Sequence, residues 1–335
     1  MILIFSIDGD ISTDIVETWL NFYNYPFKKI TSSELICKSF LMDINDRTIK
    51  LDNEQVNLES VGAIWFRRFT ISNSNYLKKI GNELDFEVAN QINKEFLSIS
   101  KGIYSSLIDK FWLVNPFSAT SINKFRVLSL AKKFNLEVPE SYIISRKEDL
   151  KELINKKNCI SKSAFEFRFM YTNKGFYSMY TTNISDDIQN KLPEIFFPSL
   201  IQVKIKKSYE IRSFFLDNCF YSMAIFSQQN AQTETDFRMY AWNKPNRFIP
   251  YNLPHSIEQK LKALLRKLEL NCASIDLIKG CDGQYYFLEV NPAGQFGMVD
   301  FSCNYGLHKK VAEFLIKWDK KYLRQKRMYG QGIIK

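Results

Sequence analysis

Apolar side chains recur along the chain with two different periods. Short apolar runs bounded by polar or turn residues predict strands over 2–7, 35–42, 48–51, 61–66 and 158–163. Apolar residues spaced three and four apart predict helices over 12–24, 80–107, 120–134, 256–268 and 309–327. Strands and helices mixed along the whole chain indicate an α/β (α+β) fold.

The first helix illustrates what the pattern implies for packing. Ser12 or Thr13 is expected to cap it, because a hydroxyl can accept a hydrogen bond from a free N–H group of the first turn. Ile15, Trp19 and Phe22 lie at helical spacing and are expected to face the core.

The region from 272 to 296 carries the clearest pattern in the chain. Two apolar runs, at 274–278 and 285–290, lie on either side of the pair Asp282-Gly283. Such a pair favours a two-residue type I′ turn, which needs positive φ at both central positions. We therefore predict an antiparallel hairpin in which the numbers of paired residues add to a constant.

This register decides which side chains share a face. Asp276 pairs with Glu289, Ile278 pairs with Phe287, and Asn291 follows Glu289 by two positions on the same face. The opposite face is expected to enter the core and carries five apolar side chains: Ile275, Leu277, Tyr286, Leu288 and Val290. The polar face then gathers two carboxylates and an amide at one end.

Asp276, Glu289 and Asn291 suit a hard divalent cation. Cross-strand neighbours lie about 5 Å apart, and two ionised carboxylates at that distance repel unless a positive charge lies between them. Three oxygen ligands favour Mg²⁺ or Mn²⁺, especially where substrate phosphates complete the coordination. From the hairpin alone, a pair of incidental surface acids remains the alternative interpretation.

Three further groups are ambiguous when taken alone. Lys162 lies within an apolar strand, where an unpaired ammonium is costly, so a phosphate is a good partner for it. Glu210 and Arg212 share a face of one strand, and the plain interpretation is a weak salt bridge. Arg67 and Arg68 follow the strand at 61–66, either facing a ligand crevice or lying on the surface.

Composition excludes several classes of function. The 335 residues are 45% apolar, which is enough for a large core divided between two or three domains. No apolar run has the length of a membrane span, and the apolar residues 1–7 end at Asp8, which predicts a first strand rather than a signal peptide. Six cysteines without paired spacing indicate reduced thiols in a cytoplasmic protein, and two histidines argue against a His-rich metal site.

The net charge of +10 suits an acidic partner, either nucleic acid or a peptide rich in Asp and Glu. No nucleic-acid-binding module accompanies the charge, so we expect no nucleic acid. The lysines are also scattered, and a solvated basic surface is the alternative interpretation, including for the outer face of the helix at 309–327.

With these residues described, a resemblance to a known family can be stated. Asp276 followed by the run FLEVNPAGQ at 287–295 resembles the metal-binding end of the ATP-grasp ligases. The form LEVNPAGQ most resembles the peptide-maturing members, the graspetide (microviridin-type) synthetases. Together with the run WFRRF at 65–69, it looks closest to the maturases called grasp-with-spasm. The resemblance implies that Asp276, Glu289 and Asn291 hold the two Mg²⁺ ions of ATP, with Mn²⁺ as a substitute.

The resemblance also implies a nucleotide site. Lys124, at a helix start, would reach the nucleotide phosphates, although alone it would be interpreted as solvated, and Lys162 would reach the α-phosphate. The loop at 164–175 would cover the triphosphate, although it contains only one glycine. Glu210 would bind the ribose. Three residues at the end of one strand would pass along the adenine edge: Gln202, Val203 and Ile205. Val203 stands where many relatives carry Glu, so that side-chain contact is lost.

Two arginines are implied to act on the reacting groups. Arg212 would face the transferred phosphoryl group, and Arg238, in a run of the form Asp-x-Arg, would hold the substrate carboxylate or acyl phosphate. Many carboxylate–amine ligases carry an arginine where this chain has Ser274, so Arg212 and Arg238 must supply that charge.

The resemblance implies an ATP-grasp fold with a leading α/β pre-ATP-grasp domain at 1–115, a central subdomain at 116–198 and a C-terminal subdomain at 199–335. The implied activity is an ADP-forming ligase that joins Asp or Glu side chains of a ribosomal precursor peptide to Ser or Thr hydroxyls or Lys amines. A radical-SAM/SPASM maturase as a partner and a homodimer are implied as well, and no membrane. The alternatives are a RimK-like ligase that adds amino acids to a protein or small acid, and a nucleotide-binding module without catalysis.

Overall fold

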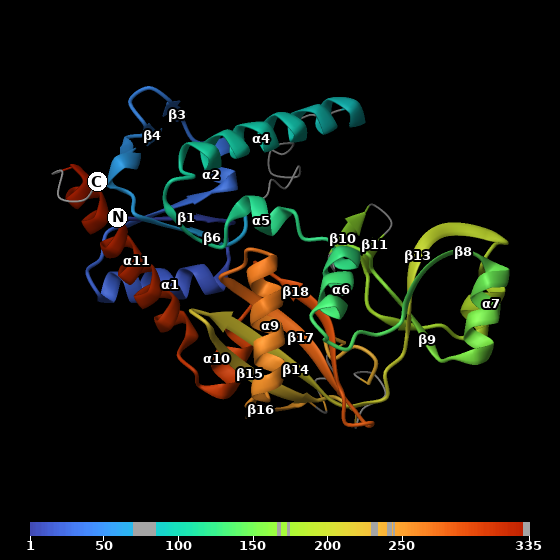
Figure 1. The fold of residues 1–335 in the computed structure, drawn as a ribbon. Coiled ribbons are helices and arrows are strands. Elements are labelled where there is room, and N and C mark those ends of the chain that lie inside the picture. The colour runs from blue at the N-terminus through green and yellow to red at the C-terminus, as the bar shows by residue number, and fades with distance from the viewer. Residues whose placement is uncertain are drawn as a thin grey trace.

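The computed structural model describes residues 1–69, 85–165, 169–172, 175–228, 234–239, 243 and 245–330. Its helices and strands form a mixed α/β architecture built on several separate sheets (Figure 1). None of the described helices is both long and apolar enough to cross a membrane.

The first sheet is parallel, with the strand order β2-β1-β6-β7. Its strands are β1 (Ile2–Ser6), β2 (Phe27–Thr31), β6 (Ala63–Phe66) and β7 (Phe111–Leu113). All five residues of β1 and all four of β6 are buried, as expected for parallel strands with both faces covered. The covering helices include α1 (Ile11–Phe22) and α4 (Phe86–Ser106). The predicted strands at 2–7 and 61–66 are therefore confirmed, and of the predicted helix at 80–107, residues 80–84 lie outside the described residues.

The prediction for the first helix was wrong in its details. Asp10 caps α1 by accepting a hydrogen bond from the N–H of Thr13, so the cap lies ahead of both predicted hydroxyls. Val16 and Leu20 form the buried stripe, whereas Phe22 is 71% exposed. The stripe is displaced because several apolar residues of this helix compete for one face, and periodicity alone does not choose among them.

A small antiparallel sheet follows, of β3 (Phe40–Asp43), β4 (Thr48–Leu51) and β5 (Glu54–Asn57), with a 3₁₀ turn at Leu58–Ser60. The predicted strand at 35–42 was half wrong, because Ser32–Cys37 forms helix α2. Thr31 and Glu34 form a reciprocal capping box there, which stabilises a helix start that apolar content does not reveal.

The central part contains a four-stranded antiparallel sheet in the order β12-β9-β13-β8. The strands are β8 (Ser141–Arg146), β9 (Cys159–Lys162), β12 (Thr182–Asn183) and β13 (Ile195–Val203), accompanied by α7 (Lys147–Lys156) and α8 (Asp186–Lys191). The segment predicted as a covering loop at 164–175 contains β10 (Phe169–Thr172), which pairs with β11 (Gly175–Ser178) as a hairpin. Residues 166–168 and 173–174 of it lie outside the described residues.

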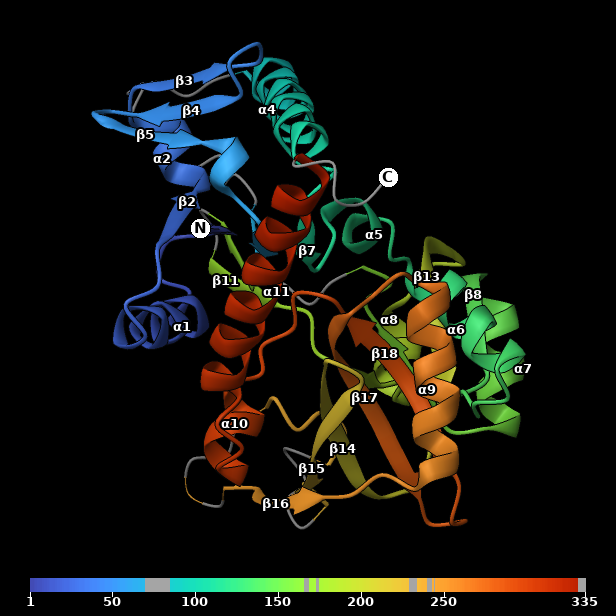
Figure 2. The ribbon, with the colours of Figure 1, turned by 60° about the vertical axis from the view of Figure 1, so that its left-hand side comes forward.

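The third sheet is antiparallel, in the order β16-β15-β14-β17-β18. Its strands are β14 (Lys207–Leu216), β15 (Cys219–Phe226), β16 (Arg247–Tyr251), β17 (Cys272–Gly280) and β18 (Tyr285–Asn291). Helices α6 (Lys124–Lys133) and α9 (His255–Lys267) pack on one face, and α10 (Gly297–Cys303) packs near the other (Figures 1 and 2). A short helix α5 (Pro116–Thr120) ends where the helix predicted at 120–134 was to begin, and that helix starts later, as α6, because the side chain of Asn123 caps its first turn.

The hairpin of β17 and β18 confirms the predicted pair Asp276–Glu289 but reaches it by another route. The connecting loop has three residues, 281–283, and Gly283 takes a φ of 83° while Asp282 keeps a negative φ. Ile278 therefore pairs with Tyr286 rather than Phe287.

A register shift between Asp276 and Leu277 then leaves Leu288 as an extra residue in β18, as in a β-bulge. Phe287, not Leu288, is fully buried opposite Leu277. The bulge cancels the longer turn, so the predicted register returns at the polar end of the hairpin.

Helix α11 (Leu307–Gly330), far along the chain, packs against α1 and the first sheet (Figure 2). The fully buried Asp319 accepts hydrogen bonds from the N–H groups of Gly62 at 2.7 Å and Ala63 at 3.0 Å, and from the hydroxyl of Tyr25 at 2.7 Å. The division into 1–115, 116–198 and 199–335 stays a prediction, and α11 joins the last of these ranges to the core of the first.

We expect Gly62→Ala to lower the free energy of unfolding by about 1–3 kcal/mol, the usual cost of overpacking. A Cβ at position 62 would lie 2.7 Å from the backbone oxygen of Asp319. Gly102→Ala is the matched control, because position 102 faces open space within helix α4 and should gain about 0.5–1 kcal/mol. Denaturant titration measures both, and equal effects would contradict the close approach of α11.

Candidate active site

The three predicted metal ligands lie together at one end of the hairpin. Asp276 on β17 pairs with Glu289 on β18, and Ser274 pairs with Asn291 two positions further along. The side chains of Asp276 and Glu289 are 14% and 17% exposed, so both carboxylates are largely withdrawn from water. The two carboxylates therefore stand opposite each other as predicted and are not exposed surface acids, and Asn291 follows two positions along the same strand.

Two lysines from other parts of the chain meet Glu289. Lys162 on β9 places its Nζ 3.1 Å from Glu289 Oε2, and Lys124 at the start of α6 places its Nζ 3.3 Å from the same oxygen. Lys124 also donates to the backbone oxygen of Ser163 at 2.8 Å. The central sheet and the third sheet thus face each other across these lysines, and Lys124 is not the solvated residue that it would be if read alone.

Asp276 has its own cation. Arg212 on β14, its register neighbour, donates from Nη1 to both carboxylate oxygens at 2.8 and 2.9 Å. The plain interpretation of a salt bridge between Glu210 and Arg212 was therefore wrong. Glu210 instead contacts Lys207 and accepts a hydrogen bond from the Ser227 hydroxyl at 3.1 Å.

The electrostatics of the pair are asymmetric. Burial raises the pKa of Asp276, the positive charge of Arg212 opposes that shift only in part, and the negative charge of Glu289 adds to it. Burial also opposes ionisation of Glu289, but Lys162 and Lys124 hold its pKa below its usual range. Burial lowers the pKa of Lys124, although Glu289 acts against that shift. The site therefore pairs two carboxylates with three cations at a place where water has little access.

The residues predicted for the adenine edge and ribose lie along one path. Gln202 is 2% exposed and donates to the Ser141 hydroxyl at 2.8 Å, so its side chain is already engaged. The backbone N–H of Val203 donates to the backbone oxygen of Glu140 at 2.9 Å. Ile205 lies between strands, and its backbone N–H makes no hydrogen bond within the described part of the chain. Glu210 is buried, and burial raises its pKa despite Lys207.

Arg238 is held by its own neighbour. Its Nε donates to Asp236 Oδ1 at 2.8 Å and its Nη2 to Oδ2 at 2.5 Å. Burial acts to raise the pKa of Asp236, but Arg238 keeps that pKa below its usual range. The negative charges of Glu289 and Asp276 also stabilise the charged form of Arg238. Sequence reasoning assigned no role to Asp236 or Lys207, although each stands two or three residues from the charged residue that it contacts.

A turn follows Asn291. It is closed by a hydrogen bond from the backbone N–H of Gly294 to the backbone oxygen of Asn291 at 3.0 Å. A Cβ at position 294 would lie 2.5 Å from the Cβ of Ser274, so glycine is required by close approach. Ser274 therefore packs against this turn. The sequence, which has Ser274 where many carboxylate–amine ligases carry arginine, did not predict this contact.

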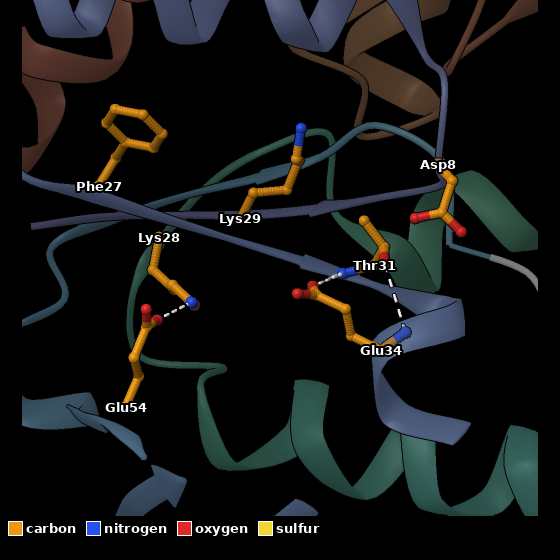
Figure 3. Close-up of a pocket in the computed structure, with 7 residues that line it drawn as sticks. All are labelled: Asp8, Phe27, Lys28, Lys29, Thr31, Glu34 and Glu54. Atoms are coloured by element: carbon orange, nitrogen blue, oxygen red, sulfur yellow. Dashed lines mark hydrogen bonds and ion pairs between the residues drawn. The ribbon is translucent and has the colours of Figure 1, made fainter. Parts of the chain in front are cut away.

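An open hollow of about 470 Å³ lies elsewhere, along the edge strand β2 of the first sheet (Figure 3). Its lining consists of Asp8, Phe27, Lys28, Lys29, Thr31, Glu34 and Glu54. Lys28 pairs with Glu54 there, and Glu34 is used by the capping box. The predicted site residues do not line this hollow, and we assign it no part in the site.

The donor set at the hairpin fits a magnesium ion. Within the described ranges no group of three or more His, Cys, Asp and Glu side chains could hold a metal ion, and the candidate donors here are the carboxylates of Asp276 and Glu289 with the amide oxygen of Asn291. Oxygen donors without nitrogen or sulfur suit Mg²⁺, which keeps waters and shares phosphate oxygens.

No protein-family model matches the sequence, and no curated protein matches it. Solved structures do match. A RiPP-associated ATP-grasp ligase of Chryseobacterium gregarium, in complex with ADP and a leader and core peptide, is 24% identical with a TM-score of 0.81, over 94% of this chain and 96% of that one.

The macrocyclase MdnC of Microcystis aeruginosa, bound with its precursor peptide MdnA, is 24% identical with a TM-score of 0.80, over 95% and 99% of the two chains. D-alanyl-alanine synthetase A of Vibrio cholerae is 13% identical with a TM-score of 0.56, over 96% and 98%. The architecture is thus that of an ATP-grasp protein, which confirms the predicted fold class. Within that fold, the chain is similar over nearly its whole length to ligases crystallised with precursor peptides.

We expect Gly294→Ala to lower the free energy of unfolding by about 1–3 kcal/mol, because the new Cβ meets Ser274. Ser274→Gly removes the obstructing Cβ, so the double variant should recover at least about 0.5 kcal/mol relative to the sum of the single effects. Denaturant titration of the three variants gives this coupling. Strict additivity would show that the turn does not lie against Ser274.

Proposed function

We propose that this protein is an ADP-forming ligase that activates Asp or Glu side chains of a ribosomal precursor peptide and joins them to Ser or Thr hydroxyls or Lys amines. The single observation that carries the proposal is the meeting of Arg212, Lys162 and Lys124 with Asp276 and Glu289. This is a site for anionic phosphates and a divalent cation, set within a fold shared with peptide ligases. The products would be macrolactones or macrolactams.

The nucleotide would lie between the central and third sheets. Lys162 and Lys124 would turn from Glu289 to the phosphates, which carry more charge than one carboxylate. The N–H of Ile205, which has no acceptor among the described residues, would meet the adenine edge, and Gln202 and Val203 would shape the strand beside it. Glu210, placed by Lys207, would accept hydrogen bonds from the ribose hydroxyls.

Asp276, Glu289 and Asn291 would hold the metal, and their release from Arg212 and the two lysines makes their oxygens available. A Mg²⁺ ion held by these residues would supply positive charge that offsets the charge developing on the transferred group. ADP and Mg accompany solved relatives of this fold, which supports ATP and magnesium here. A second ion follows only from the sequence resemblance, and replacement by Mn²⁺ follows from the oxygen donors.

Two bond exchanges complete the reaction. An oxygen of the substrate carboxylate attacks the γ-phosphorus, the bond to the β-phosphate oxygen breaks, and ADP leaves with those electrons. The hydroxyl or amine then attacks the acyl carbon, the acyl–phosphate bond breaks, and the proton of the nucleophile is released as phosphate leaves. Arg212 and Arg238 would stabilise the transferred group and the acyl phosphate, since guanidinium binds planar oxyanions with two donors.

A precursor peptide is the partner that fits best. The solved relatives include ligases in complex with precursor, leader and core peptides, and the net charge of +10 suits an acidic peptide. Ring closure would gain from the high effective concentration of two groups in one chain. A radical-SAM/SPASM maturase of the same pathway, a homodimer and a cytoplasmic location are further parts of this proposal, taken from the sequence.

We expect the protein, given ATP, Mg²⁺ and the acidic peptide encoded beside its gene, to lower the peptide mass by one or more waters. Glu289→Gln should reduce this dehydration by at least about 100-fold, because it removes a ligand charge for the metal, as loss of one transition-state donor does elsewhere. Glu152→Gln is the matched control, since Glu152 is 71% exposed on α7 and pairs with Lys156. Intact mass spectrometry measures all three.

The mass also separates the alternatives. A gain equal to an amino acid would favour a RimK-like ligase, which is consistent with the likeness to a D-alanyl-alanine synthetase. Tight nucleotide binding with no change in any supplied peptide would favour a binding module. Mild alkaline hydrolysis of a dehydrated product would distinguish ester from amide.

We expect Lys162→Met to weaken ADP binding by about 10- to 100-fold, because a hydrogen bond to a charged group contributes about 1.5–3 kcal/mol. Lys156→Met serves as its control, since Lys156 is exposed on α7 and pairs only with Glu152 among the salt bridges of the described residues. Calorimetric titration gives both affinities. Equal affinities would remove Lys162 from the nucleotide site.

A further inference from the structure

Arg67 lies just past the end of β6 and is almost fully buried, with 2% of its surface exposed. Its Nε lies 3.4 Å from Asp10 Oδ1, where the chain leaves β1 for α1. Because parallel strands β1 and β6 are neighbours, both residues stand at the same edge of the first sheet. This edge faces the turn that follows the candidate metal ligands.

The guanidinium of Arg67 reaches across to that turn. Its Nη1 donates to the backbone oxygens of Ala293 and Gly294, the latter at 3.2 Å. The Nε of Arg68 lies 3.4 Å from the same oxygen of Ala293. The Arg67 guanidinium also lies 5.7 Å from the centre of the Phe296 ring. An arginine of the first sheet therefore holds two carbonyls and a ring of a segment more than 200 residues away.

The opposite side of the same turn is held by the active site. Arg212, which binds Asp276 with Nη1, donates from Nη2 to the backbone oxygen of Gln295 at 3.3 Å. The turn itself is closed by the hydrogen bond from Gly294 to Asn291. One short segment is thus fixed between two arginines from different sheets, and it carries Asn291 at its start.

This arrangement is costly for the fold. Nη2 of Arg67 is buried with no hydrogen-bond partner among the described residues, and burial lowers the pKa of Arg67 to about 10 although Asp10 opposes that shift. A buried, incompletely paired cation destabilises a protein. Its presence here therefore points to a role other than stability. Stability of the first sheet alone does not account for it, because the carbonyls that Arg67 binds belong to the site segment.

We propose that Arg67 is a positioning residue that fixes the turn at 291–295, and with it Asn291 and the orientation of Arg212, for phosphoryl transfer. This rests on the proposed function. The first sheet then acts on the reaction through backbone carbonyls, without touching nucleotide or peptide. Lysine cannot replace arginine here, because a single ammonium does not present a planar fork to two carbonyls and a ring at once.

The test compares Arg67→Lys with Arg47→Lys. Arg47 is a matched control in the same part of the chain, since it also donates to a backbone carbonyl, that of Ser106, but lies far from the turn. In Arg67→Lys, amide hydrogen exchange of the peptide containing 291–295 should accelerate at least about tenfold in the absence of ligands, as expected when local opening becomes cheaper. The control should leave it unchanged.

The second readout is the split between binding and turnover. Arg67→Lys should lower kcat for peptide dehydration about 10- to 100-fold, with KM for ATP within about twofold, because the turn contacts the metal ligand and not the nucleotide base. The concentration of Mg²⁺ needed for half-maximal ADP binding should rise about tenfold. Arg68→Lys, which alters one long contact to the turn among the described residues, should show the same pattern with a smaller change and covers the case in which Arg67→Lys does not fold.

Unchanged exchange at 291–295 together with unchanged Mg²⁺ dependence would overturn the proposal. An equal loss of kcat and melting temperature in Arg67→Lys and Arg47→Lys would also overturn it, because a general stability effect would then explain both. If the wild-type protein binds Mg²⁺ and ADP but dehydrates no peptide, the proposed function fails while the exchange and Mg²⁺ readouts still decide the role of Arg67.

Discussion

Two carboxylates on neighbouring strands, largely withdrawn from water, need positive charge close by, and this requirement governs the arrangement of the site. Asp276 takes Arg212 from the adjacent strand, whereas Glu289 takes Lys162 and Lys124 from the central sheet and from α6. Each of these cations also suits a phosphate. In the proposed reaction these cations would turn from the carboxylates to the nucleotide phosphates and the carboxylates would turn to the metal, so few new charged groups would be needed.

The first sheet is joined to the rest of the fold largely by hydrogen bonds in which one partner is a backbone group. Arg67 binds backbone oxygens, Asp319 accepts backbone N–H groups, and Gly62 and Gly294 allow the close approaches. Such contacts tolerate changes in most neighbouring side chains. They depend strictly on a few small or charged residues, which is where substitutions should have the largest effect.

The polar face of the hairpin could be predicted because alternation and register need only local information. The prediction of Asp276 opposite Glu289 held even though the turn was longer than expected, since the extra residue in β18 restored the register. The faces nearer the turn came out wrong for the same reason, with Phe287 buried in place of Leu288. Helix α2 was missed because its start is stabilised by a capping box and not by apolar spacing.

Contacts between distant segments could not be read from the sequence in the same way. Lys124 and Lys162 were expected near phosphates through a family resemblance, yet their meeting at Glu289 depends on how two sheets face each other. Arg67 was left between a ligand-facing and a surface interpretation. It is buried and not on the surface, and it contacts the turn after Asn291, which the sequence could not predict because local pattern contains no information on which remote carbonyl a side chain reaches.

Helix α11 has a consequence for how the chain matures on the ribosome. It contacts β1, β6, β7 and α1, which are translated long before it. At about 5–20 residues per second, the intervening chain takes on the order of tens of seconds to emerge. During that interval the apolar residues of the first sheet that α11 covers lack that cover, and the N–H groups of Gly62 and Ala63 lack Asp319 as their acceptor.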